Sequence, residues 1–137
     1  MSEGWKPKRL WPRREREFGV EISVHEAMPL DGEGPWRWCV YAYVRKAHPH
    51  FKAFEGDDIF QDAGQSMPFH WGCTYIEWTF DGDGSALCVK AGADYGHLHD
   101  GWFTHQDQMP PEVQKDADEL YEWLAARGSD EKVKGDA

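Results

Sequence analysis

The sequence predicts an α+β domain, in which a mainly antiparallel sheet of about four to five strands carries one C-terminal helix packed on it. Segments with alternating apolar and polar residues come first, a strong turn signal joins two of them, and a helical stripe appears only near the C-terminus. The 137 residues include eight tryptophans and 15% aromatic residues, a composition typical of a folded chain. This length suits one domain with a single modest core.

The first strands are predicted from their alternation. Residues 1–16 carry charges and two prolines without periodicity, so we expect a basic N-terminal arm there. A half-buried strand should follow, because four apolar residues alternate with polar ones: Phe18, Val20, Ile22 and Val24. The segment 36–45 has apolar side chains on both faces, which predicts a strand in the middle of the sheet.

The second half contains a hairpin and the helix. Residues 46–71 are predicted to be irregular, and strands are expected at 73–80 and 86–91. The intervening Asp81-Gly82-Asp83-Gly84 favours a hairpin turn over a calcium loop, because the twelfth position of such a loop would be Gly92 rather than Glu. A helix should begin at Pro110-Pro111 and end at Arg127-Gly128. The globular domain is therefore expected at 17–127, followed by a flexible tail at 128–137.

The candidate site lies in the segment Gly92-Ala93-Asp94-Tyr95-Gly96-His97-Leu98-His99-Asp100. In an antiparallel hairpin, the end of the second strand lies beside the start of the first. The candidate segment follows the strand at 86–91 and His70 precedes the strand at 73–80, so His70 is expected beside His97. Imidazole and carboxylate groups from one short segment suit a divalent metal such as Zn, Mn or Fe. The candidate metal ligands are His70, Asp94, His97, His99 and Asp100.

Three other interpretations of this segment remain open. Without a metal, an aspartate that orients a histidine makes a general base, whereas an Asx-type turn would give the residues a purely structural role. The segment can also bind a ligand or a partner through His70, Trp71, Asp94, Tyr95, His97, Asp100 and Trp102, with the tryptophans as pocket walls. His48 and His50 are two further histidines that could reach the candidate site. The residues therefore leave open whether the protein is an enzyme.

Composition limits the partners. The formal net charge is −10, and because residues 1–18 carry six Lys/Arg against three Glu, the rest carries −13. Direct nucleic-acid binding is therefore not expected, while a basic partner or a cation is compatible with this charge. Three cysteines without a C-x-x-C spacing predict reduced thiols in a cytoplasmic protein. No apolar run approaches the roughly 18 residues of a membrane span, so no membrane association is expected.

The same segments resemble a group of small proteins of tailed bacteriophages and prophages that have no established activity. The similarity covers about residues 36–126 and rests on Trp38-Cys39-Val40-Tyr41, His48-Pro49, Gly56-Asp57-Asp58, His70-Trp71-Gly72-Cys73-Thr74 and the Gly92–Asp100 segment. The resemblance implies a phage accessory protein in the host cytoplasm. Such a protein would bind a host or defence component, or a small ligand, and is a candidate counter-defence inhibitor. The alternative is a metal-dependent, hydrolytic enzyme that uses the His/Asp cluster.

Overall fold

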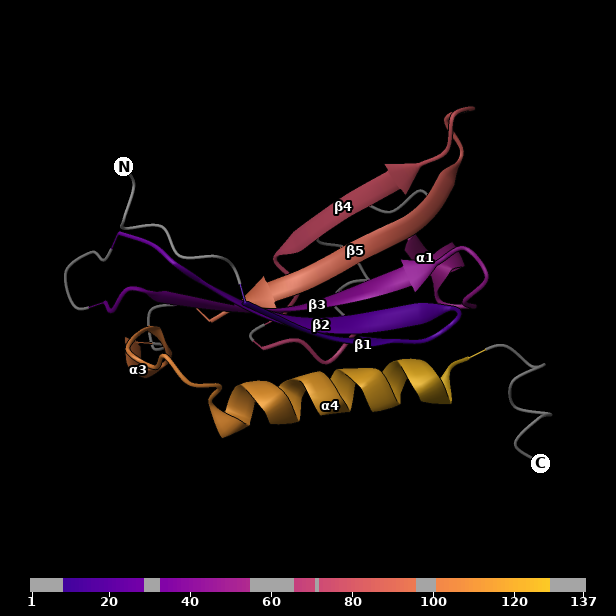
Figure 1. The fold of residues 1–137 in the computed structure, drawn as a ribbon. Coiled ribbons are helices and arrows are strands. Elements are labelled where there is room, and N and C mark those ends of the chain that lie inside the picture. Colours follow the sequence, from indigo (N-terminus) through magenta and orange to yellow (C-terminus); the bar gives the residue numbers. More distant parts are fainter. Residues whose placement is uncertain (1–8, 29–32, 55–65, 71, 96–100, 129–137) are drawn as a thin grey trace.

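The predicted α+β class is confirmed by the computed structural model, which describes residues 9–28, 33–54, 66–70, 72–95 and 101–128. Within these ranges, five antiparallel strands form one sheet in the order β1-β2-β3-β5-β4, and helix α4 lies across one face of it (Figure 1). The elements in chain order are β1 (Arg9–Arg14), β2 (Phe18–Glu26), β3 (Trp36–Arg45), α1 (Phe51–Phe54), β4 (Tyr75–Phe80), β5 (Ala86–Asp94), α3 (Gly101–Thr104) and α4 (Pro111–Ala126).

The core forms between α4 and the strands β2 and β3. Pro111 opens the helix at its first position, where the missing N–H of proline costs nothing, and Glu112 follows in the first turn. One stripe of the helix is buried, namely Val113, Ala117, Leu120 and Leu124. It packs on the buried side chains of the two strands, among them Phe18, Val20, Ile22, Val24, Trp38, Val40, Ala42 and Val44. The apolar stripe of the helix and the apolar face of the two strands therefore pack together in one layer.

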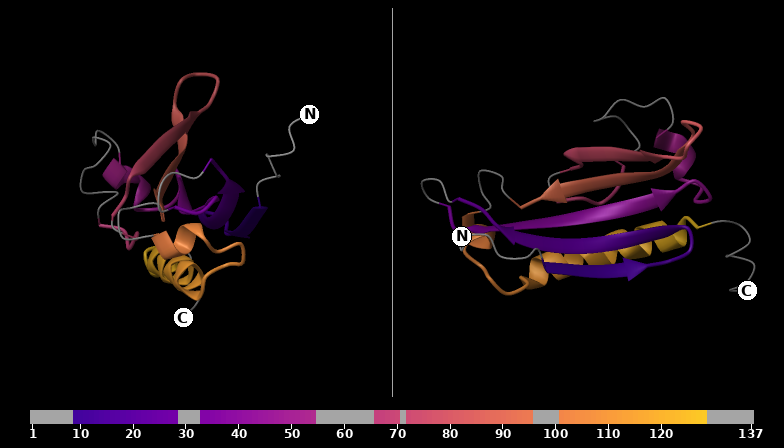
Figure 2. Two further views of the ribbon diagram at one scale, coloured as in Figure 1. Left: turned by 90° about the vertical axis from the view of Figure 1, so that its left-hand side faces the viewer. Right: turned by 45° about the horizontal axis from the view of Figure 1, so that its top comes forward.

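The β4–β5 hairpin is turned steeply away from the plane of β1 to β3, as two views of the ribbon show (Figure 2). Helix α1 packs against it, with the ring centroids of Phe51 and Phe54 at 5.8 and 6.4 Å from that of Trp78. Trp78 is in register with Val89, and Val89 with Val44, so α1 and α4 cover the same face of the sheet. The opposite face carries neither of these helices.

The N-terminal part differs from the prediction. Residues 9–14, expected within an arm, form strand β1, which pairs with β2 at the edge of the sheet. Pro12 and the arginines of this segment removed the usual strand signal, yet an edge strand tolerates proline because one of its sides pairs with nothing further in the sheet. Residues 1–8 of the expected arm and residues 129–137 of the expected tail lie outside the described residues.

Strand boundaries also shift. β4 begins at Tyr75 rather than Cys73, and β5 continues beyond Ala91 to Asp94, so the candidate segment starts inside a strand instead of in a loop. Gly92 allows this continuation, because a Cβ atom there would come within 2.3 Å of Cδ1 of Tyr41 on the neighbouring strand.

Two single-turn helices, α1 and α3, were not predicted, since one turn is too short to show a period. None of the helices in the described ranges is long and apolar enough to span a membrane.

Candidate functional site

Three segments that are distant in sequence meet at His70, Tyr95 and Asp116, which we call the His70–Tyr95–Asp116 cluster. The Tyr95 ring is 1% exposed and stacks on the His70 imidazole, with 4.2 Å between the centroids and 20° between the planes. The Tyr95 hydroxyl donates to Oδ2 of Asp116 on α4 over 2.5 Å. Phe103 packs against both rings, at 5.7 Å from His70 and 5.0 Å from Tyr95. The cluster joins the chain before β4, the end of β5 and the helix.

The geometry of the cluster favours positioning over proton transfer. Nδ1 of His70 lies 3.9 Å from Oδ2 of Asp116, which is beyond hydrogen-bond length but close enough for attraction once the ring is protonated. The buried hydroxyl of Tyr95 needs a partner, and the carboxylate supplies it. Asp116 therefore fixes the tyrosine, and the tyrosine ring fixes His70 and the short segment 66–70 against the helix.

The other predicted site residues are divided between described and undescribed parts of the chain. Asp94 is exposed at the end of β5, in register with Cys39. The next residue, Tyr95, is buried. Trp102 in α3 is 53% exposed and contacts Phe103 edge-on at 5.1 Å. Outside the described residues lie Trp71, His97, His99 and Asp100.

The metal hypothesis stays a prediction. Within the described ranges, no three His, Cys, Asp or Glu side chains are grouped so that they could hold a metal ion. Three of the five proposed ligands, His97, His99 and Asp100, are outside those ranges. His97, which was expected beside His70, is among these three. Within the described part of the candidate segment, His70 stacks on Tyr95.

His48 and His50 belong to a different part of the fold. His48 is 1% exposed, and its Nε2 lies 2.9 Å from the carbonyl oxygen of Leu124, near the C-terminal end of α4. Its Nδ1 accepts the backbone N–H of His50 at 3.0 Å. Leu124 follows Asp116 by eight residues, roughly 12 Å along a helix. The His48–His50 pair therefore anchors the helix end and does not join the His70–Tyr95–Asp116 cluster.

The cysteines are packing residues in this fold. Cys39 and Cys73 are buried and Cys88 is half-buried. Burial raises the pKa of the Cys73 and Cys88 thiols above their usual value, which keeps these sulfurs protonated and weakly nucleophilic.

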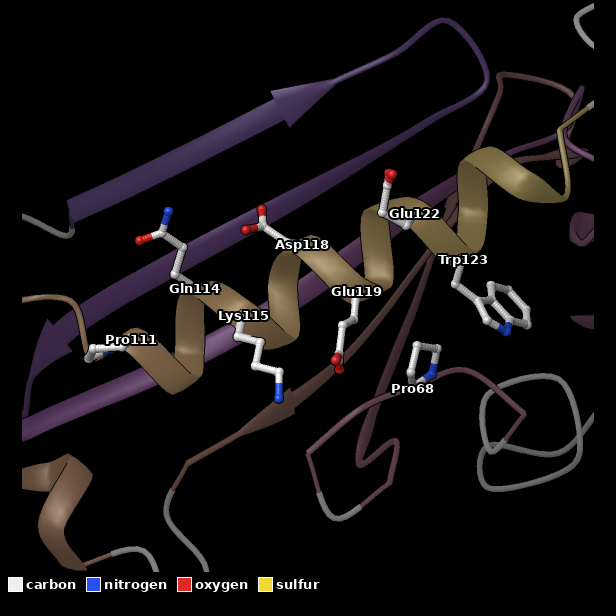
Figure 3. A pocket seen from close by; sticks show the side chains of 8 residues that line it. All are labelled: Pro68, Pro111, Gln114, Lys115, Asp118, Glu119, Glu122 and Trp123. Carbon is white, nitrogen blue, oxygen red and sulfur yellow. The ribbon is translucent and has the colours of Figure 1, made fainter.

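The outer face of α4 is a feature that sequence reasoning missed. A depression of about 690 Å³ runs along it, walled by Pro68 from the segment before β4 and by Trp123 near the end of the helix (Figure 3). Its other lining residues are mostly polar and lie on successive turns of the helix: Pro111, Gln114, Lys115, Asp118, Glu119 and Glu122. The polar lining residues form the exposed stripe of the predicted helix and could have been noted in the sequence. The position of Pro68 beside them depends on the tertiary fold.

The face of the sheet opposite α1 and α4 has a second polar arrangement that the sequence did not reveal. Nζ of Lys90 lies 4.2 Å from the ring centroid of Tyr41, and the Tyr43 and Tyr75 rings are at 5.4 and 5.8 Å. Tyr43 donates to Oε1 of Glu21 over 3.1 Å, and burial raises the pKa of Tyr43 to about 12. Lys90 thus occupies an aromatic cage of its own chain.

Comparison with known proteins finds no match to a family model, a curated protein or a solved structure. The similarity to phage proteins therefore stays a prediction.

The cluster makes a direct prediction for stability. Tyr95→Phe keeps the buried ring but removes the hydroxyl donor to Asp116, so we expect unfolding to require about 1 kcal/mol less free energy. Tyr75→Phe is the matched control, because its hydroxyl donates to Glu77 at the exposed surface and its loss should cost less than about 0.5 kcal/mol. Urea denaturation measures both. Equal effects of the two variants would show that the contact with Asp116 has no special weight.

Proposed function

We propose that this protein is a binding protein, and that the outer face of α4 holds a basic segment of a partner protein. The observation that carries the proposal is the depression between Pro68 and Trp123, whose helical side is lined by carboxylates. Along Pro111–Ala126 the helix has five Asp and Glu residues against one lysine. All three lining carboxylates, Asp118, Glu119 and Glu122, are exposed. Asp118 lies 3.6 Å from the Arg13 guanidinium, so Glu119 and Glu122 supply most of the attraction.

Charge and shape act together at this surface. The acidic helix supplies attraction for Lys and Arg, and the Trp123 ring and Pro68 supply apolar surface for the stems of such side chains. A basic group of the chain itself already uses this ring, because the Arg127 guanidinium carbon lies 3.9 Å from the centroid of Trp123. Contact of this kind between a guanidinium and an indole is the interaction expected of a partner arginine.

The His70–Tyr95–Asp116 cluster supports the binding surface from behind. Asp116 lies on α4 between the lining positions, and His70 follows Pro68 by two residues. By holding His70 against the helix, Tyr95 and Asp116 also hold Pro68 at a fixed place beside it. A preformed depression loses less conformational entropy on binding than one that must assemble.

The class of partner follows from the charge and from the resemblance to phage proteins. An overall charge of −10 disfavours nucleic acid and favours a basic protein surface. Because the sequence resembles phage accessory proteins, we expect that partner to be a host component. If the partner is a host defence protein, this chain is a counter-defence inhibitor.

The test removes charge from the depression without changing the fold. In Glu119→Gln/Glu122→Gln the two exposed carboxylates are neutralised, and a fluorescent Lys/Arg-rich peptide should bind about tenfold more weakly than to the unchanged protein. Asp81→Asn/Asp83→Asn is the matched control, since it changes the net charge equally in the exposed β4–β5 turn and should alter affinity less than about twofold. Fluorescence anisotropy at two salt concentrations measures both.

Two outcomes would contradict the proposal. Equal losses in the helix and turn variants would mean that the peptide senses only the total charge. Unchanged binding in the helix variant would place the basic segment elsewhere. The same pair of variants, used as baits for host lysate, then identifies partners whose capture depends on the α4 depression.

A further inference from the structure

A second groove, of about 570 Å³, lies between strand β1 and helix α4, and we call it the β1–α4 groove. Its floor consists of Val20 and Ile22 from β2 and Ala117 from the helix, which are 3%, 6% and 5% exposed. Gln114 and Asp118 line both this groove and the depression beside Pro68, so they form the ridge between the two. The volume falls in the range typical of small-molecule sites.

One wall of the groove is a fixed aromatic ring. Trp11 on β1 stacks on Trp38, with 5.7 Å between the centroids and 20° between the planes. Trp38 is fully buried, and its Nε1 donates to the carbonyl oxygen of Gln106 over 2.9 Å. The buried indole therefore sets the orientation of Trp11, which lines the groove at 36% exposure. A rigid indole in a wall favours flat aromatic ligands.

The rim offers hydrogen bonds of both kinds without net charge. Arg13 lies 3.6 Å from Asp118, and its guanidinium carbon is 3.4 Å from the centroid of the Tyr121 ring. The guanidinium is therefore already balanced by a carboxylate and an aromatic face, which leaves little attraction for a phosphate. Gln108, in the segment before α4, and Gln114, on α4, add amide donors and acceptors to the rim. Such a rim matches an uncharged ligand with donors and acceptors on its edge.

We propose that the β1–α4 groove binds an uncharged planar heteroaromatic molecule of the nucleobase class. Its ring packs on the apolar floor beside Trp11, and its edge bonds to the glutamine amides and the Arg13–Asp118 pair. Burial of the ring against the floor and Trp11 provides the affinity, and the amides provide the selection. This site adjoins the proposed partner surface and shares Gln114 and Asp118 with it, but Glu119 and Glu122 line only the partner surface.

The test titrates the full chain with adenosine, guanosine, cytidine and uridine, followed by calorimetry and tryptophan fluorescence. At least one nucleoside should bind saturably with one site per chain. Gln114→Trp fills the groove from an exposed helical position and should weaken this binding by about tenfold. Glu112→Trp is the matched control, because it adds the same side chain at an exposed position of the first helical turn outside the groove, and it should bind as the unchanged protein does.

Thermal unfolding of both variants checks that each is folded. The proposal is overturned if none of the four nucleosides binds, or if Gln114→Trp binds as tightly as Glu112→Trp. It is also overturned if a nucleoside monophosphate binds while its nucleoside does not, because the phosphate would then be the recognised group.

Discussion

Trp38→Ala is expected to lower the free energy of unfolding by about 3–5 kcal/mol. Trp38 is fully buried on β3, stacks on Trp11 and donates its indole N–H to the carbonyl of Gln106. Its loss leaves a large cavity and an unpaired carbonyl in the segment that leads into α4. Both losses act on the same layer, so local repacking recovers little of the energy.

Trp102→Ala is the control for this prediction. It removes the same side chain from α3, where the indole is 53% exposed, and should change stability by less than about 0.5 kcal/mol. Denaturant unfolding followed by circular dichroism measures the two variants side by side. A cost below about 1 kcal/mol for Trp38→Ala would contradict the packing described for β3.

Gly34→Ala should destabilise the fold by about 1–3 kcal/mol through overpacking. A Cβ atom at Gly34 would lie 2.2 Å from the backbone oxygen of Thr104 and 2.7 Å from Nδ1 of His105. The backbone has no room to retreat, because the Gly34 N–H already donates to Oγ1 of Thr104 over 2.8 Å in a buried position. The substitution must therefore separate the start of β3 from α3.

Gly82→Ala provides the comparison for Gly34→Ala. Nothing lies within 4 Å of a Cβ atom at Gly82, and its backbone is outside the left-handed region, so alanine should be neutral or slightly stabilising. Thermal unfolding distinguishes the two. Equal melting temperatures for both variants would mean that the contact between residue 34 and α3 is looser than the structure describes.

The fold was predictable where one periodicity governs a whole element. The alternation from Phe18 to Val24 and the stripe on 110–127 gave the correct strand and helix, because one apolar face of each packs on the core. The strand was expected to be half-buried, but Phe18–Val24 is buried on both faces, Glu21 and Ser23 included. β1 was missed because an edge strand with Pro12 and arginines is not governed by burial on both sides. Similarly, α1 and α3 are single turns held by contacts from other segments.

The candidate site was predictable only in part, for the same reason. Hairpin pairing correctly suggested that the chain at His70 returns to the end of β5, where it meets Tyr95. The partner carboxylate of Tyr95 was not foreseeable, since Asp116 follows it by 21 residues on a helix whose rotation only the core determines. In sequence, Asp116 fits equally well as an ordinary charge near a helix start.

The two edges of the sheet hinder the addition of a further strand in different ways. Pro12 leaves β1 without one amide donor, and the neighbouring arginines add positive charge to that edge. β4 has the sequence YIEWTF, with no proline and a single charge. The pairing of β4 with β5 shifts register between Thr79 and Phe80, and such an irregularity, like the proline and positive charge on β1, hinders pairing with the edge of another sheet. Growth of the sheet by addition of a further strand is therefore disfavoured at both edges.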